Sequence, residues 1–145
     1  KRNVDSSRLI FANKLPLDQH LARHSLGDLG LDTFNYNGHT TTSDSLWAGL
    51  PVLTKAGNSF SARVSASLLT SLGIPELITY SEEEYEEKAL NLARDKDKLI
   101  ELKSKLAKFR TSSTLFNSKL YTKNLESKFS RLVKSWRYLL ERKDN

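Results

Sequence analysis

Short apolar runs alternate along the chain with segments whose apolar residues recur at helical spacing. The apolar runs are RLIFAN at residues 8–13, LGLDT at 29–33, PVLTK at 51–55 and ELITY at 76–80. Runs this short and apolar are typical of strands buried on both faces, which occur in parallel sheets covered by helices. We therefore predict an α/β fold in which a parallel sheet carries helices on both faces. The 145 residues suffice for one such domain.

Capping residues mark the ends of most of the expected helices. Serine, asparagine and aspartate favour the start of a helix, whereas glycine and a following proline favour its end. The first helix is expected at residues 16–25, and the second from about Thr40 to Ala48, before Gly49 and Pro51. The third is expected to run from a cap at Asn58 or Ser59 to Gly73. Two more helices are expected, one after a capping box of Ser81 and Glu84 and one after a cap at Asp95.

A last helix carries a long apolar stripe, made of Tyr121, Leu125, Phe129, Leu132, Trp136 and Leu139. This stripe is longer than one face of a small sheet covers, so part of it is expected to remain under-buried. The isolated chain is then expected either to self-associate through this helix or to leave the end of the helix mobile. The alternative is that the helix folds onto its own domain, because stripes of this width are normal on core-facing helices.

Composition excludes several classes of protein. The chain has no cysteine, which excludes a disulfide framework and thiolate metal sites, and it has no apolar run long enough for a membrane span. The first residues, KRNVDSSR, lack the apolar core of a secretory signal, so a cytoplasmic setting is expected. The chain begins with Lys1 rather than methionine, which suggests a fragment of a longer protein.

The net charge of +6 is concentrated in the second half of the chain. Lysine recurs there at helical spacing, without the glycine–aromatic or arginine-rich patterns of nucleic-acid-binding modules. A solvated helix face is the preferred interpretation, and a polyanion-binding surface is the alternative.

The stretch YNGHTTTSDSLWAGLP at residues 36–51 gathers small polar groups at a predicted helix start. It follows a predicted strand, at the end of a parallel sheet where ligands bind. A helix start offers unpaired N–H groups to phosphate, Gly38 lets the backbone approach closely, and Thr40 and Thr41 add hydroxyl donors. We interpret the stretch as an anion cradle.

Two neighbours extend this cradle. His39 can donate to the same anion, and Asp44, one turn into the helix, can accept from a sugar hydroxyl such as that of a ribose. In the alternative interpretation, Thr41 and Asp44 form only a capping box and His39 is a turn residue.

The stretch LPLDQHLAR at residues 15–23 supplies a second candidate group. His20 and Arg23 fall on one helical face after a predicted strand. A flat imidazole can lie under a planar base, and a guanidinium can meet base carbonyls or phosphates. The alternative is a surface pair without a ligand.

Five motifs carry a resemblance to a known family: NGHTTTSDSLWAGLPVLT, SARVSASLL, GIPELI, EYEEKALNLARD and STLFNSKLYTKNLE. In this order they resemble the C-terminal catalytic half of the O-linked N-acetylglucosamine transferases, the protein glycosyltransferases of family 41. The likeness runs from about Arg8 to about Trp136. Its core, GHTTxxDxLWAGxP from Gly38 to Pro51, is highly specific.

The resemblance implies a GT-B fold, in which two Rossmann-like domains enclose the active site and tetratricopeptide repeats usually precede them. Residues 1–145 are similar to the second, C-terminal domain, which binds the donor. The helix at 117–143 is then expected to cross back to the missing N-terminal catalytic domain. The isolated 145 residues are expected to be inactive, because one wall of the site is absent.

The resemblance also assigns roles to residues of the two candidate groups. The pyrophosphate of UDP would be held by His39, Thr40 and Thr41, of which His39 and Thr40 also have the catalytic role of stabilising the leaving group. Asp44 would bind the ribose, His20 and Arg23 would flank the uracil, and the backbone around Leu15 would contact the base edge. Many relatives have a lysine where this chain has Leu17, which leaves the donor sugar open.

The implied reaction is inverting transfer of N-acetylglucosamine from UDP-GlcNAc to serine or threonine of proteins. It needs no metal or other cofactor, and the partners are the UDP-sugar and acceptor proteins, with no membrane or nucleic acid. A lysine that neutralises the pyrophosphate, and the catalytic base, are expected outside this chain. Two alternatives remain: a family relative with another UDP-sugar or an asparagine acceptor, and a non-catalytic interaction domain with a basic helical face.

Overall fold

Three parallel strands form a sheet in the order in which they occur along the chain. The computed structural model describes residues 4–141, and their side chains through residue 136. The strands are β1 (Gly30–Leu31), β2 (Val52–Lys55) and β3 (Ile78–Thr79). Gly30 lies opposite Val52, and Thr54 lies opposite Ile78. The prediction of an α/β fold with a parallel sheet is confirmed.

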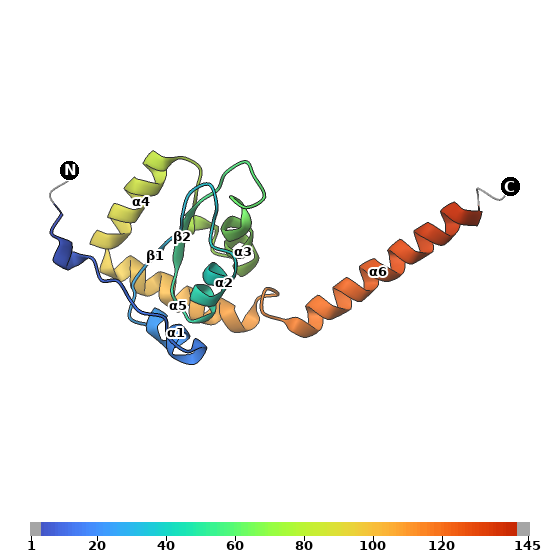
Figure 1. Cartoon of the computed structure of the whole chain (residues 1–145), viewed down its shortest axis with the longest axis horizontal. Helices are drawn as coiled ribbons and strands as arrows, with labels where there is room; N and C mark the ends of the chain where they lie inside the picture. The colour runs from blue at the N-terminus through green and yellow to red at the C-terminus, as the bar shows by residue number, and fades with distance from the viewer. Residues whose placement is uncertain (1–3, 142–145) are drawn as a thin grey trace.

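Helices cover both faces of this sheet, as predicted (Figure 1). α2 and α3 lie side by side on one face and α4 on the other, while α5 runs beneath the sheet. The helices are α1 (Leu17–His24), α2 (Thr40–Trp47), α3 (Val64–Leu72), α4 (Glu82–Arg94), α5 (Lys96–Ser112) and α6 (Ser118–Glu141), with short 3₁₀ turns at η1 (Ser6–Arg8) and η2 (Pro75–Leu77). No helix among residues 4–141 is both long and apolar enough to cross a bilayer.

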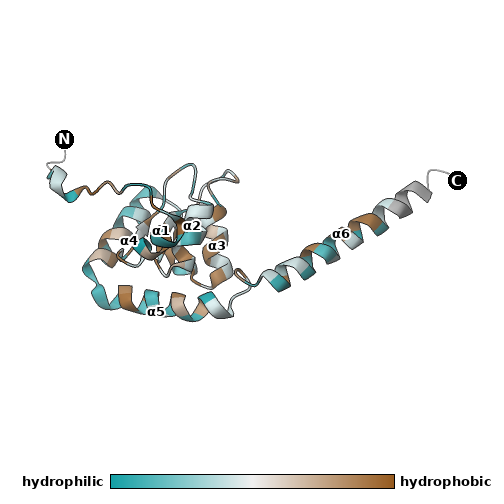
Figure 2. Ribbon diagram, turned by 60° about the horizontal axis from the view of Figure 1, so that its bottom comes forward, coloured by the Kyte–Doolittle hydropathy of each residue, from teal (hydrophilic) through white to brown (hydrophobic). Residues whose placement is uncertain are grey.

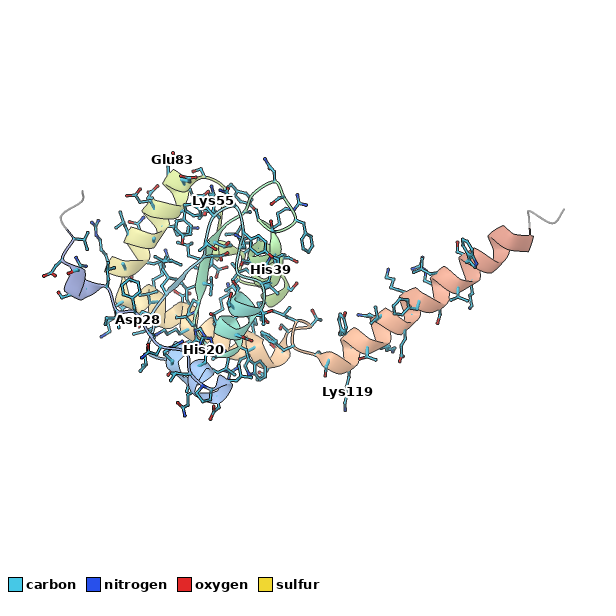
Figure 3. All side chains as sticks on the ribbon, viewed as in Figure 1. His20, Asp28, His39, Lys55, Glu83 and Lys119 are labelled. Carbon is cyan, nitrogen blue, oxygen red and sulfur yellow. The ribbon has the colours of Figure 1, made fainter. Side chains whose placement is uncertain are left out.

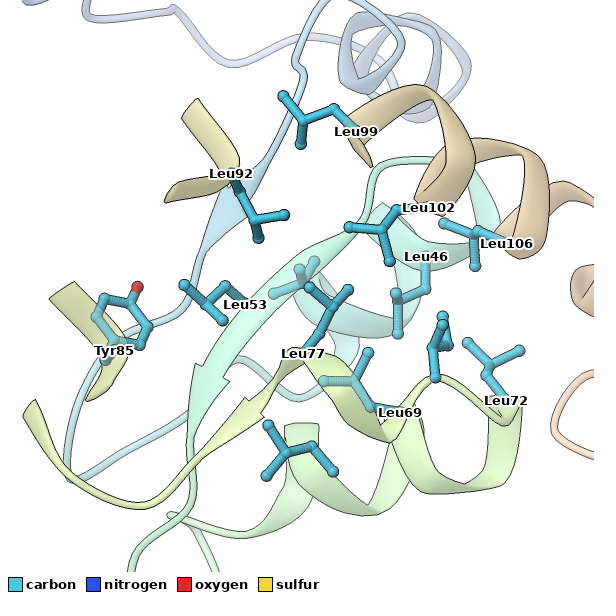
Figure 4. Close-up of a cluster of buried hydrophobic side chains, with 13 residues drawn as sticks. Leu46, Leu53, Leu69, Leu72, Leu77, Tyr85, Leu92, Leu99, Leu102 and Leu106 are labelled. Carbon is cyan, nitrogen blue, oxygen red and sulfur yellow. The ribbon is translucent and has the colours of Figure 1, made fainter. Parts of the chain in front are cut away.

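Leucine side chains from the sheet and from four helices form the core (Figure 4). Leu53 of the central strand, Leu46 of α2 and Leu69 of α3 are fully buried. Burying a leucine stabilises a fold by about 1.5–3 kcal/mol, so these contacts hold α2 and α3 against the sheet. α5 adds Leu99, Leu102 and Leu106 to the same core.

Polar contacts fix α5 at the end of the sheet opposite the candidate site. Lys103 Nζ donates to the carbonyl oxygen of Gly27 and to Asp28, both at 2.9 Å, and Lys105 pairs with Glu76. Because Gly27 and Glu76 precede β1 and β3, α5 lies along the amino ends of the strands. The carboxyl ends are left free for a ligand.

Two of the predicted helix caps are present. Ser81 Oγ accepts a hydrogen bond from Glu84 N at 3.0 Å, and Asp95 Oδ1 accepts one from Lys98 N at 2.9 Å. The cap expected for α3 is wrong, since the helix begins at Val64 with Arg63 before it. Ser59 instead accepts from Ala62 N at 3.2 Å, which stabilises a turn that precedes the helix.

The prediction of a buried strand at residues 8–13 is wrong. These residues form no strand, and Ile10 and Phe11 are each 90% exposed. An apolar run becomes a buried strand only where another strand pairs with it, and within residues 4–141 β1 pairs only with β2. The runs at 29–33 and 76–80 contain strands of two residues each, the second because Pro75 opens a 3₁₀ turn.

α6 projects away from the rest of the fold (Figures 1 and 2). Its apolar stripe is exposed as expected, from 39% at Leu125 to 66% at Tyr121. The prediction also included Leu139, which lies outside the residues whose side chains are described. It also included residues 142–143, which lie outside the described chain.

Candidate functional site

Asp32 organises the loop that leads from β1 to α2. Its Oδ1 accepts hydrogen bonds from Gly38 N at 2.7 Å and from Thr33 N at 2.9 Å, and its Oδ2 accepts from Thr54 Oγ1 at 2.6 Å. The Tyr85 hydroxyl donates to its backbone carbonyl at 3.0 Å. One carboxylate therefore ties both ends of the loop to the central strand, at the carboxyl ends of the strands.

Gly38 is enclosed by hydroxyl groups. Ser65 Oγ donates to the Gly38 carbonyl at 2.9 Å, so the Thr42 hydroxyl must donate to Ser65 across their 3.0 Å contact. A Cβ atom on Gly38 would lie 2.7 Å from Thr41 Oγ1 and would clash with Thr42 Oγ1. Only glycine fits here, and the buried Thr42 serves the loop rather than a ligand.

The start of α2 carries no side-chain cap. His39 occupies the N-cap position without a capping hydrogen bond, and Thr40 and Thr41 are exposed. The capping-box alternative for Thr41 and Asp44 is therefore wrong. A cavity of about 220 Å³ adjoins the helix start and is lined in part by Asp32, Gly38 and Thr41. This helix start can accept an anion.

His39 lies at the helix start (Figure 3), and two aromatic rings lie against it. Its ring stacks on that of Tyr36, with centroids 4.9 Å apart, and the Phe60 ring meets it edge-on at 6.1 Å. His39 Nε2 is buried and has no hydrogen-bond partner among the described residues. A buried polar atom without a partner is unfavourable, so a ligand whose acceptor atom reached His39 Nε2 past these rings would gain a favourable hydrogen bond.

α1 packs against α2 and brings the second candidate group to it. Arg23 Nη2 lies 2.7 Å from His20 Nδ1, and Arg23 Nη1 donates to the Asn13 carbonyl at 2.9 Å. The two side chains are half-buried and joined to each other, unlike an unstructured surface pair. His20 and His39 lie on different parts of the surface, so the two candidate groups meet through the helices rather than directly (Figure 3).

The remaining sequence candidates take less constrained positions. Asp44 is half-buried on α2, and Leu15 is 37% exposed just before α1. Leu17 is the first residue of α1 and is 66% exposed.

Sequence reasoning missed several residues that support the site: His24, Ser45, Ser65, Tyr36 and Phe60. His24 had a signal, because it follows His20 by four positions on the same helical face. Ser65 is 27 positions from Gly38, and nothing local in the sequence indicates their hydrogen bond.

Asp95 and Asp97 have the spacing of a metal-binding carboxylate pair, but Asp95 caps α5. They lie at the junction of α4 and α5, on helices away from the α2 start. Among residues 4–141 there is no group of three or more side chains arranged to hold a metal ion.

The fold matches that of a glycosyltransferase of the GT-B class. The chain is similar to the solved structure of an O-GlcNAc transferase mutant, K341M, from Thermobaculum terrenum, with a TM-score of 0.84 and 35% sequence identity. The match covers 90% of this chain and 25% of that one. Residues 1–125 also match the model of glycosyl transferase family 41. The chain belongs to this family.

Curated relatives come from animals and plants. The chain is 39% identical over 136 residues to a UDP-N-acetylglucosamine–peptide N-acetylglucosaminyltransferase of Caenorhabditis elegans, covering 94% of this chain and 12% of that protein. It is 38% identical over 132 residues to the probable enzyme SEC of Arabidopsis thaliana, covering 90% of this chain and 14% of that one. The chain thus spans only a small part of the length of these relatives.

Proposed function

We propose that this chain is the UDP-sugar-binding part of an inverting protein O-glycosyltransferase. In this proposal the enzyme moves N-acetylglucosamine from UDP-GlcNAc to serine or threonine of acceptor proteins in the cytoplasm. The observation that carries the proposal is the uncapped start of α2, where the exposed Thr40 and Thr41 lie beside a cavity that Gly38 helps to line, in a chain of family 41.

Each part of the donor has a proposed set of contacts. The N–H groups and hydroxyls of Thr40 and Thr41 hold the pyrophosphate, and the orphaned Nε2 of His39 donates to the same group. Asp44 accepts from the ribose. The uracil lies against His20 and Arg23, with the backbone of Leu15 at its edge.

The proposed catalytic role of this chain is to stabilise the leaving group. When the bond between the sugar and UDP breaks, negative charge develops on the β-phosphate. The partial positive charge of the α2 start, with His39 and Thr40, is placed to stabilise that charge. The proposal assigns no metal to this step. The catalytic base and the acceptor site belong to parts of the enzyme outside this chain, so the chain alone is inactive.

Leu17 supports a second candidate within the same family. It is exposed at the first position of α1, beside the proposed base site, and cannot make a charged contact with a nucleotide. A different UDP-sugar, or an asparagine acceptor, is therefore the alternative to UDP-GlcNAc and serine or threonine. Comparing UDP-GlcNAc with UDP-glucose and UDP-galactose as ligands would separate the donor alternatives.

Replacement of Thr40 and Thr41 by valine tests the cradle. The double variant should weaken UDP binding by about 1–3 kcal/mol, the range for lost hydrogen bonds to a charged group. Uridine, which has no phosphate, should bind as before. Isothermal titration calorimetry with UDP and with uridine measures both affinities.

A second double variant controls for the change from threonine to valine. Thr70 on α3 and Thr122 on α6 are exposed and donate only within their own helices. Replacing both by valine should leave both affinities unchanged. Equal losses of UDP and uridine in the Thr40/Thr41 variant would show that the cradle does not bind the pyrophosphate.

A further inference from the structure

His24 lies between the proposed base site on α1 and the helix start of α2. Its Nε2 is 3.4 Å from His20 Nε2, and its Nδ1 is 3.4 Å from Ser45 Oγ. Ser45 in turn donates to the Thr41 carbonyl at 2.8 Å. His24 therefore connects His20 and Arg23 to Ser45 in a continuous series of contacts that ends at the first turn of α2.

The donor and acceptor roles along this series are determined at both ends. Arg23 can only donate, so His20 Nδ1 accepts, and neutral His20 carries its proton on Nε2. Ser45 uses its proton on Thr41, so it accepts from His24 Nδ1. His24 Nε2 is then free to accept from His20 Nε2. When both imidazoles are neutral, all four hydrogen bonds run in the same direction, from Arg23 to the Thr41 carbonyl.

We propose that His24 is a positioning residue for the nucleotide, which fixes the tautomer and ring orientation of His20 and couples the base site on α1 to the phosphate site on α2. This inference rests on the proposed function. Because both nitrogens of His20 are held by protein groups, the ring face is the part of His20 that can contact a uracil.

α1 depends on such polar contacts for its position. None of its residues is fully buried, so apolar packing fixes α1 less firmly than it fixes α2 and α3. The series from Arg23 to Thr41, with the bond from Arg23 to Asn13, supplies directional contacts that apolar packing does not.

Protonation of His24 disrupts the series, because both ring nitrogens then donate and Nε2 faces another donor. The charged and titratable groups facing His24 are His20 and Arg23 on α1 and Asp44 on α2. Burial, then His20 and Arg23, lower the pKa of His24 below its ordinary value, while Asp44 opposes them. The series is therefore complete above the ordinary histidine pKa and is lost as the pH falls through the lowered value. Nucleotide binding should therefore weaken as the pH falls below the ordinary histidine range.

The tautomers can be read directly by NMR. Long-range ¹H–¹⁵N correlation spectra of the chain at pH 7.5 should show His20 protonated on Nε2 and His24 on Nδ1. The opposite tautomer on either ring would overturn the inference. This measurement needs no nucleotide, so it stands apart from the proposed function.

Variants of His24 test the coupling. His24→Leu should weaken uridine and UDP about three- to tenfold at pH 7.5, the effect of one or two lost hydrogen bonds. His24→Gln should restore most of the affinity, since its amide can accept from His20 and donate to Ser45, and should retain affinity at pH 5.5 better than the parent chain. Gln19→Leu, an exposed change on the same helix, is the control and should have no effect.

The outcomes separate the two proposals. If His24→Leu keeps the affinity and pH dependence of the parent chain, the inference is overturned and the proposed function stays intact. The same holds if His24→Gln binds the nucleotide no more tightly than His24→Leu. If the parent chain binds neither UDP nor uridine, the proposed function fails, and the role of His24 in nucleotide binding fails with it even where NMR shows the expected tautomers. Circular dichroism confirms that each variant is folded.

Discussion

At the scale of single residues, Gly38 links the backbone of the site to its hydroxyl groups. A methyl group there meets Thr41 and Thr42, and both neighbours are held by the helix. We expect Gly38→Ala to lower the free energy of unfolding by about 1–3 kcal/mol, the usual cost of overpacking. UDP affinity should fall about tenfold or more, because a displaced helix start loses contacts to charge worth about 1.5–3 kcal/mol each. Thermal melting and calorimetry measure the two effects.

Gly49 provides the matched control for this change. It ends α2 with a φ of 91°, and a Cβ there meets nothing within 4 Å. Gly49→Ala should therefore cost about 1–2 kcal/mol of backbone strain without affecting UDP. If both alanine variants lose stability equally and neither affects UDP, Gly38 has no special role in the cradle.

Tyr85 connects α4 to the same loop, and its ionisation should affect stability at high pH. Burial, and after it the Asp32 carboxylate, raise the pKa of the Tyr85 phenol to about 12. Since this pKa lies above the unfolded value near 10, its contribution to stability is complete below pH 10 and is lost as the pH rises through 12. Tyr85→Phe should cost about 1 kcal/mol at neutral pH for the lost hydrogen bond, and denaturant unfolding between pH 7 and 11 measures it.

An absorbance titration of the tyrosines gives an independent check. In the parent chain one phenol should ionise at a clearly higher pH than an ordinary tyrosine, and this late step, at high pH, should be missing in Tyr85→Phe. If the late step persists in the variant, the raised pKa belongs to another residue.

At the scale of elements, helices were easier to predict than strands. The caps at Ser81 and Asp95 were found because they depend on residues three positions apart. The apolar run at 8–13 forms no strand, because burial of a strand depends on a pairing partner far along the chain. The same limit applies to the site: the Gly38 cradle is local in sequence, whereas its support comes from the loop residue Asp32, from Thr54 of β2 and from Ser65 of α3.

α6 is the element whose apolar surface is least satisfied. Five residues of its stripe, Tyr121, Leu125, Phe129, Leu132 and Trp136, are exposed, with Val133 beside them. We expect the chain to self-associate through this helix, because exposed stripes of this kind bury themselves against a partner. Light scattering over a range of concentrations should show a rising average mass.

Leu132→Lys should abolish this self-association, whereas Ile100→Lys, which changes an exposed residue of α5, should not. Hydrogen exchange offers a second readout. If the parent chain is strictly monomeric and residues 129–136 are as protected as the sheet, the stripe is satisfied within the chain and the expectation is wrong.

At the scale of the whole molecule, the chain presents its site at an open edge. α5 closes the amino ends of the strands through Lys103 and Lys105, whereas the carboxyl ends lie beside a cavity open to solvent. The chain spans 25% of the similar Thermobaculum chain. We propose that a further domain of a longer protein supplies the second wall of the site, and that α6 crosses to it, which would cover the stripe.

The order of the strands also determines how this fold can assemble. β2 is the centre of the sheet, and its two partners are the strands that precede and follow it in the chain. Each pairing closes a loop that is short compared with the whole chain, so the entropic cost of forming the sheet is modest and contacts are mostly local. Within the described residues 4–141, neither the segment before β1 nor α6 contributes a strand. The residues from β1 to α5 can therefore fold as a unit during synthesis, before α6 packs against any other surface.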